Sequence, residues 1–203
     1  MVLQALTLVL LLQAPGDGWA LAQVPDREVK TLYWELFDTS ETWVSVIPSG
    51  PKDEPPLTRL ILQAFFVGKS TAGPPSRVVL RALGLPMTIM RDYSLKLTVD
   101  DKAFDLAPAC ASPAGSGPPC QLLYPPGANS SANGVAVDLD PGLVERLAGA
   151  HAVTGTALGF PIVLSPDDLA ALARFAETAH LKDASKSEGG GGGVRPQMAG
   201  TSS

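Results

Sequence analysis

Hydrophobic and polar residues alternate through much of the middle of the chain, which is typical of strands that bury one face. The clearest case is 93–99, YSLKLTV, where every second residue is large and apolar. Residues 58–67 are apolar at nearly every position, as in a strand covered on both faces. Pro- and Gly-rich segments separate these runs. The pattern predicts strands at 31–38, 42–47, 58–67, 77–83, 93–99, 103–106 and 135–139, and a broken strand at 152–164.

Two helices are predicted near the C-terminal end. Each begins with a residue whose side chain can accept a hydrogen bond, followed by a proline: Asp140-Pro141 and Ser165-Pro166. The first residue of each pair is the expected N-cap, and the proline is the expected first helical residue. Asp168 completes a variant of the capping box with Ser165. The order of elements predicts a mainly β fold, an antiparallel sandwich or barrel-like sheet with two short C-terminal helices.

Aromatic residues gather in the first two predicted strands. In an extended segment Tyr33 and Phe37 share one face and Trp34 lies on the other, while Trp43 follows in the next strand. One face would then belong to the core and the other form an exposed platform for a partner or a sugar. The alternative is that both faces are packed. We take Tyr33, Trp34, Phe37 and Trp43 as the candidate binding surface.

The N-terminal segment has the order of a secretory signal peptide. Residues 2–14 are apolar and uncharged, a Pro/Gly segment follows, and Ala20-Leu21-Ala22 has the small-x-small pattern of a cleavage site. No Lys or Arg precedes the apolar run. We expect a signal peptide at 1–22 and a periplasmic or secreted protein. The alternatives are an N-terminal helix packed on the domain and a retained anchor.

The C-terminal segment has a different composition from the middle of the chain. Residues 182–203 contain five consecutive glycines and almost no large apolar side chain. Such a segment buries too little apolar surface to offset the entropy of ordering. We therefore expect a disordered tail at 182–203 and a single folded domain at 28–181.

The chain has two cysteines, Cys110 and Cys120, separated by a Pro/Gly-rich loop without a large apolar side chain. In an exported chain this spacing favours one disulfide that closes the loop. Two buried thiols or a redox pair remain as alternatives. The only histidines are His151 and His180, too few for a Cys/His zinc site.

Charge and motifs exclude several classes of function. With 15 basic and 20 acidic residues in 203, the net charge of -5 argues against a nucleic-acid partner. No apolar run reaches the roughly 18 residues of a transmembrane helix. Motifs of nucleophile elbows, P-loops, dinucleotide sites and zinc proteases are absent from the sequence. We predict no catalytic residue, no metal and no cofactor; the sequence leaves enzymatic activity open and favours its absence.

From about Ser94 to Thr178 the chain resembles the invasion-associated locus B family of exported bacterial proteins. The run that carries the resemblance consists of LTVDDKAFDL, a segment with Cys110 and Cys120, VDLDPGLVERLAGA, LGFPIVL and DLAALARFA. The resemblance implies a periplasmic or surface β-sandwich without catalytic residues.

The leading hypothesis is an exported, non-enzymatic β-rich domain that binds or assembles with another cell-envelope component, an envelope protein or a small ligand. Two alternatives remain. One is a secreted hydrolase that uses two facing carboxylates. The other is a carrier of a small molecule or lipid inside the β fold.

Overall fold

The computed structural model describes residues 26–50, 58–84, 92–106, 120–123 and 133–181. The predictions for 1–22, 182–203 and Cys110 lie outside these residues. The elements in chain order are β1 (Lys30–Trp34), the 3-10 turn η3 (Glu35–Phe37), β2 (Thr39–Val46), β3 (Thr58–Val67), β4 (Arg77–Gly84), β5 (Leu95–Val99), β6 (Lys102–Asp105), β7 (Cys120–Leu123), β8 (Gly134–Asp138), α1 (Pro141–Gly149), β9 (Val153–Ala157), β10 (Phe160–Val163) and α2 (Pro166–Thr178).

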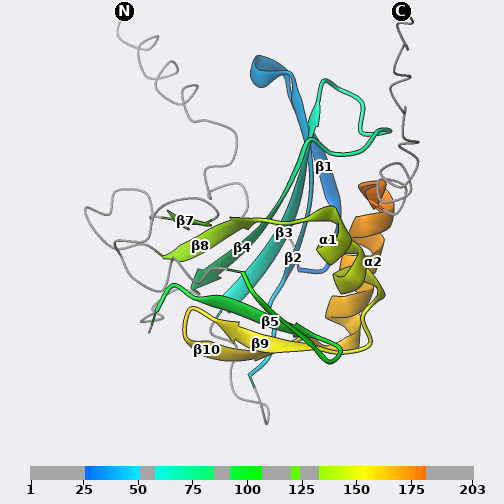
Figure 1. The fold of residues 1–203 in the computed structure, drawn as a ribbon. Helices are drawn as coiled ribbons and strands as arrows, with labels where there is room; N and C mark the ends of the chain where they lie inside the picture. Colours follow the sequence, from blue (N-terminus) through cyan, green and yellow to red (C-terminus); the bar gives the residue numbers. More distant parts are fainter. Residues whose placement is uncertain (1–25, 51–57, 85–91, 107–119, 124–132, 182–203) are drawn as a thin grey trace, which may run out of the picture.

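The strands form two antiparallel sheets, as the sequence predicts (Figure 1). The large sheet has the order β1-β2-β3-β4-β8-β7, and the small sheet has the order β10-β9-β5-β6. Two separate segments of the chain form the small sheet: β5 and β6 first, and β9 and β10 later in the sequence. One face of the large sheet, called here the inner face, packs on a second layer made of the small sheet and both helices.

Alternation along the strands explains how this core forms. In β2, β3 and β4 the even-numbered residues point to the inner face, and Val44, Leu62 and Leu80 meet there in cross-strand register. Leu97 of the small sheet and Phe175 of α2 belong to the same buried cluster. Burying such apolar side chains stabilises the fold by roughly 1.5–3 kcal/mol each.

The odd-numbered residues of the central strands point to the opposite face of the large sheet, called the outer face. Ile61 and Gln63 of β3 are fully buried there, so β3 is covered on both faces, as its continuous apolar run predicts. Trp43 and Ile61 form a small apolar cluster on the outer face with Leu83 beside them.

Both predicted helix starts are confirmed. The Asp140 side chain accepts a hydrogen bond from the backbone N–H of Gly142, one of the amides left open at a helix start. Ser165 and Asp168 form a complete capping box, because each side chain accepts from the other residue's backbone N–H.

The first hairpin differs from the prediction. Residues 31–38 are not one strand, because β1 ends at Trp34 and η3 turns the chain. Asp38 closes the turn in the left-handed conformation (φ 46°, ψ 49°), which Asp tolerates better than most residues. Its backbone N–H reaches Glu35 O, and its carboxylate accepts from the Tyr33 hydroxyl at 2.9 Å. The residues 39–41, expected to connect the strands, therefore belong to β2.

Two other elements also differ. The broken strand expected at 152–164 is the hairpin of β9 and β10, turned by Leu158 and Gly159, both at positive φ. β7, a four-residue edge strand, was not predicted. Within the described ranges, neither helix is long and apolar enough to cross a membrane.

Candidate functional site

Two chain connections project side by side from one end of the large sheet (Figure 1). One is η3, between β1 and β2, and the other is the loop 68–76, between β3 and β4. They are joined directly, because Gly68 N donates to Asp38 O at 2.7 Å and the Ser40 hydroxyl donates to Gly68 O at 2.8 Å. The two connections therefore form one structural unit.

This end of the sheet carries the exposed large apolar residues of the described chain. Leu36 in η3 is 71% exposed and Val67, the last residue of β3, is 82% exposed. Phe37 and Leu32 are each about two-fifths exposed, at 41% and 40%. We call Leu32, Leu36, Phe37 and Val67 the apolar end. No described large hydrophobic residue elsewhere is exposed to this degree, so the exposure is concentrated at one place.

Tyr33, beside the apolar end, makes two polar contacts, one with Lys69 and one with Asp38. The ammonium group of Lys69 lies 5.9 Å from the centre of the Tyr33 ring, within the range of a cation–π contact. The hydrogen bond from the Tyr33 hydroxyl to Asp38 raises the pKa of Tyr33, because it favours the protonated phenol beside a carboxylate. Glu35 and Asp38 are both exposed, so acidic groups flank Leu36 and Phe37.

A buried polar cluster lies on the outer face, next to the apolar end. Glu41 of β2 is only 2% exposed, and its Oε2 accepts from Gln63 Nε2 at 2.9 Å. Burial raises the pKa of Glu41, because a carboxylate loses hydration there. The indole N–H of Trp34, the Gln63 amide and the positive charge of Arg81 act in the opposite direction. Glu41 Oε1, Gln63 Oε1 and Trp43 Nε1 have no hydrogen-bond partner among the described residues.

Among the described residues, the cluster lacks the facing carboxylate pair that the hydrolase alternative requires. A glycoside hydrolase needs two carboxyl groups facing each other, and Glu41 pairs with an amide. Other carboxylates serve structural roles: Asp140 and Asp168 cap helices, and Asp100 accepts from the backbone of His151 and Ala152. Among the described residues, no group of three or more His, Cys, Asp or Glu side chains is placed to hold a metal ion.

The four aromatic residues of the predicted binding surface do not share one face. Phe37 is exposed at the apolar end. Tyr33 pairs with Ser40 and lies on the inner-face side of the large sheet. Trp34 pairs with Thr39 and lies on the outer-face side. Both aromatic side chains are half-buried. Trp43 is 6% exposed in the outer-face cluster, so it contributes packing there and no exposed surface.

Sequence reasoning missed Leu36, Val67, Glu41 and Gln63. Val67 closes an apolar run, so nothing in the pattern separates it from the buried residues before it. Glu41 lay in the segment expected to be a turn, and its burial follows only from the true start of β2.

The predicted disulfide is outside what the structure describes. Cys120 begins β7 opposite Val137 of β8, and Cys110 lies in a range that is not described. The bond therefore stays a prediction.

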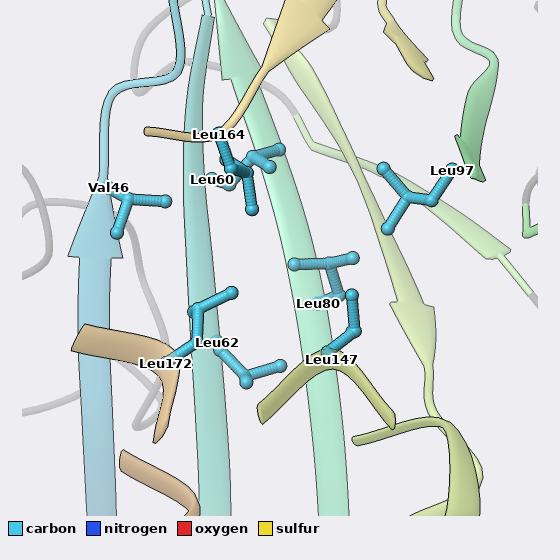
Figure 2. Close-up of a pocket in the computed structure, with 8 residues that line it drawn as sticks. All are labelled: Val46, Leu60, Leu62, Leu80, Leu97, Leu147, Leu164 and Leu172. Atoms are coloured by element: carbon cyan, nitrogen blue, oxygen red, sulfur yellow. The ribbon is translucent and has the colours of Figure 1, made fainter. Parts of the chain in front are cut away.

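A cavity in the described part of the core is very small. Figure 2 shows the eight apolar side chains that surround a cavity between the large sheet, the small sheet and the helices. Its volume is about 10 Å³, whereas small-molecule sites measure roughly 300–1,000 Å³. The residues around it are Val46, Leu60, Leu62, Leu80, Leu97, Leu147, Leu164 and Leu172. This part of the core has no room for a carried ligand.

Comparisons with protein-family models, with curated proteins and with solved structures found no significant match to this chain.

Proposed function

We propose that this protein is an exported, non-enzymatic domain that binds or assembles with another cell-envelope component through its apolar end. The observation that carries the proposal is the concentration of exposed apolar residues on η3 and the adjoining strands. The composition of 1–22 and the spacing of the two cysteines support the exported location.

The physical reason is the cost of leaving these side chains in water. Fully burying one Leu, Phe or Val side chain is worth roughly 1.5–3 kcal/mol, and contiguous exposed apolar surface marks interaction sites. The backbone hydrogen bond between Gly68 and Asp38 holds the two connections together before any partner arrives. A preformed surface loses less conformational entropy on binding than a loose one.

The proposal has two parts, and each has its own experiment. The export part is tested by producing the full chain in a bacterium and determining the N-terminus of the product in the periplasmic or secreted fraction. We expect it to begin at Gln23. A full-length chain that stays in the cytoplasm contradicts this part.

The docking part is tested by site-specific photocrosslinking in cells of the source organism. A photoreactive residue replaces Leu36, and a matched control replaces Thr154, which is exposed on β9 of the small sheet. We expect crosslinks to an envelope component from position 36 and none from position 154. Equal crosslinking from both positions contradicts docking through the apolar end.

A further inference from the structure

The shape of the apolar end narrows the kind of partner it fits. Leu36 lies in η3 and Val67 is the last residue of β3, at the end of the sheet from which the two connections project (Figure 1), and both side chains are more than two-thirds exposed. A stable protein interface covers roughly 800 Å² on each partner. The apolar end has four exposed large apolar residues, few beside the roughly 20–30 residues on one side of such an interface. A lipid surface, in contrast, adapts its shape to a projecting group.

Next to the exposed apolar residues lie residue types that favour the water–lipid boundary. Tyr33 and Trp34 end β1, immediately before η3, and both are half-buried. Tyr and Trp rings are enriched at this boundary, because each has an apolar body and a polar group. Lys69 follows Val67 by two residues, and long lysine side chains extend from apolar surroundings to the headgroup region.

The charges around the apolar end select the type of lipid. The charged residues of the two connections are Glu35 and Asp38 in the first and Lys69 in the second, and Arg77, which follows the second, is paired with Asp138. Lys30, at the other end of β1, lies 3.7 Å from Glu28. There is thus no excess of basic side chains that would attract an anionic surface. Attraction to lipid would rest on the apolar residues and would persist on a zwitterionic surface.

We propose that the apolar end inserts Leu36, Phe37 and Val67 into the interfacial layer of a lipid bilayer, with Tyr33, Trp34 and Lys69 at the level of the headgroups. The inference rests on the proposed function, because it names the envelope component that this end contacts. Insertion is shallow and reversible, since three side chains provide far less buried area than a membrane-spanning helix.

The test is flotation of the exported protein with phosphatidylcholine vesicles at low and high salt. All variants carry the same N-terminus, so any contribution from that segment is common to them. We expect the unaltered protein to float with the vesicles and to change less than about twofold between 50 and 500 mM salt. Leu36→Asp and Val67→Asp each weaken flotation by about tenfold or more, because a charge is inserted into the lipid.

Thr154→Asp is the control, with the same added charge on the small sheet, and leaves flotation unchanged. The melting temperature of each variant is measured as well. Because the side chains of Leu36 and Val67 are exposed, we expect both variants to keep the fold. Absence of flotation by the folded protein, or equal flotation of Val67→Asp, overturns the inference. Flotation that requires anionic lipid and disappears with salt overturns it as well. A protein crosslinked from position 36 without flotation removes the lipid inference and leaves the proposed function standing.

Discussion

The Nε of Arg27 donates a 2.8 Å hydrogen bond to Oδ1 of Asp168, 141 positions further along the chain. Asp168 is 1% exposed and also closes the capping box of α2. The backbone N–H of Arg27 bonds to Ser45 O in β2, and its carbonyl accepts from Arg174 of α2. One buried carboxylate therefore connects the start of the last helix to the segment that leads into the large sheet.

Replacing Asp168 should destabilise the protein strongly. Asp168→Ala removes the Asp168 half of the capping box and leaves Arg27 without its buried acceptor, so we expect the free energy of unfolding to fall by about 2–4 kcal/mol. The neighbouring Asp167 is largely exposed and lies 3.7 Å from Arg27. Asp167→Ala should cost less than about 1 kcal/mol. Urea denaturation of the two variants measures the difference, and equal losses would contradict the role assigned to Asp168.

Glu41 should make stability depend on pH in a definite direction. Burial raises the pKa of Glu41 in the folded state above its unfolded value. The folded protein therefore holds this proton more tightly than the unfolded chain. The contribution to stability is fully present below the unfolded pKa and is lost as the pH rises through the folded pKa.

Glu41→Gln isolates this effect, because the amide stays uncharged and keeps a hydrogen-bonding group next to Gln63. We expect the variant to gain stability relative to the unaltered protein as the pH rises from about 4 to about 8. Denaturation curves of both proteins across that range give the difference directly. A difference that does not change with pH would show that Glu41 titrates alike in the folded and unfolded states.

Two glycines should respond to alanine in opposite ways. A Cβ at Gly155 would lie 2.0 Å from the carbonyl oxygen of Lys96 in β5, so Gly155→Ala has to push two paired strands apart. We expect a loss of at least about 2 kcal/mol. Gly149 ends α1 and a Cβ there meets nothing within 4 Å. Gly149→Ala should be neutral or stabilise by up to about 1 kcal/mol. Thermal melts that shift in the same direction for both variants would refute this explanation.

The aromatic residues first grouped as one surface should separate in their effects on stability. Trp43→Ala empties a buried site on the outer face, for which we expect a loss of about 3–5 kcal/mol. Phe37→Ala changes an exposed residue and should cost less than about 1 kcal/mol. Denaturation measures both, and a large loss for Phe37→Ala would show that the apolar end also supports the fold.

The pair Cys110 and Cys120 should be oxidised in the exported protein. We expect intact mass after alkylation to show two blocked thiols, which become reactive only on reduction. On the chain-entropy account, closing so short a loop stabilises the protein by roughly 2–3 kcal/mol. The reduced protein should therefore melt at a lower temperature. Free thiols without reduction would remove the disulfide, and an unchanged melting temperature would remove its role in stability.

The fold class was predictable because its signals are local. The continuous run of β3 and the alternation over 95–99 each report which faces are buried, and both agree with the structure, although β5 starts at Leu95 and Ser94 is buried. The helix starts at Asp140 and Ser165 were predictable for a similar reason, since an N-cap and a following proline act within a few residues.

The candidate site was less predictable because it depends on pairing and on turn geometry. The left-handed conformation of Asp38 sets the phase of β2, and that phase decides that Glu41 faces the buried cluster. The exposure of Val67 follows from where β3 ends against Thr39, which no property of the run TRLILQAFFV reveals. Distant contacts such as Arg27 with Asp168 have no sequence pattern at all.

The order of strands in the two sheets also constrains when the fold can assemble. β5 lies between β6, its neighbour in the chain, and β9, which follows more than fifty residues later. In the large sheet, β4 likewise pairs on one side with β8, which comes much later in the chain. Long-range pairings close slowly, because loop entropy is lost before the contact forms. An N-terminal fragment that ends before β9 leaves an edge of β5 unpaired and the inner face without α2, so the core closes only once nearly the whole described chain is present.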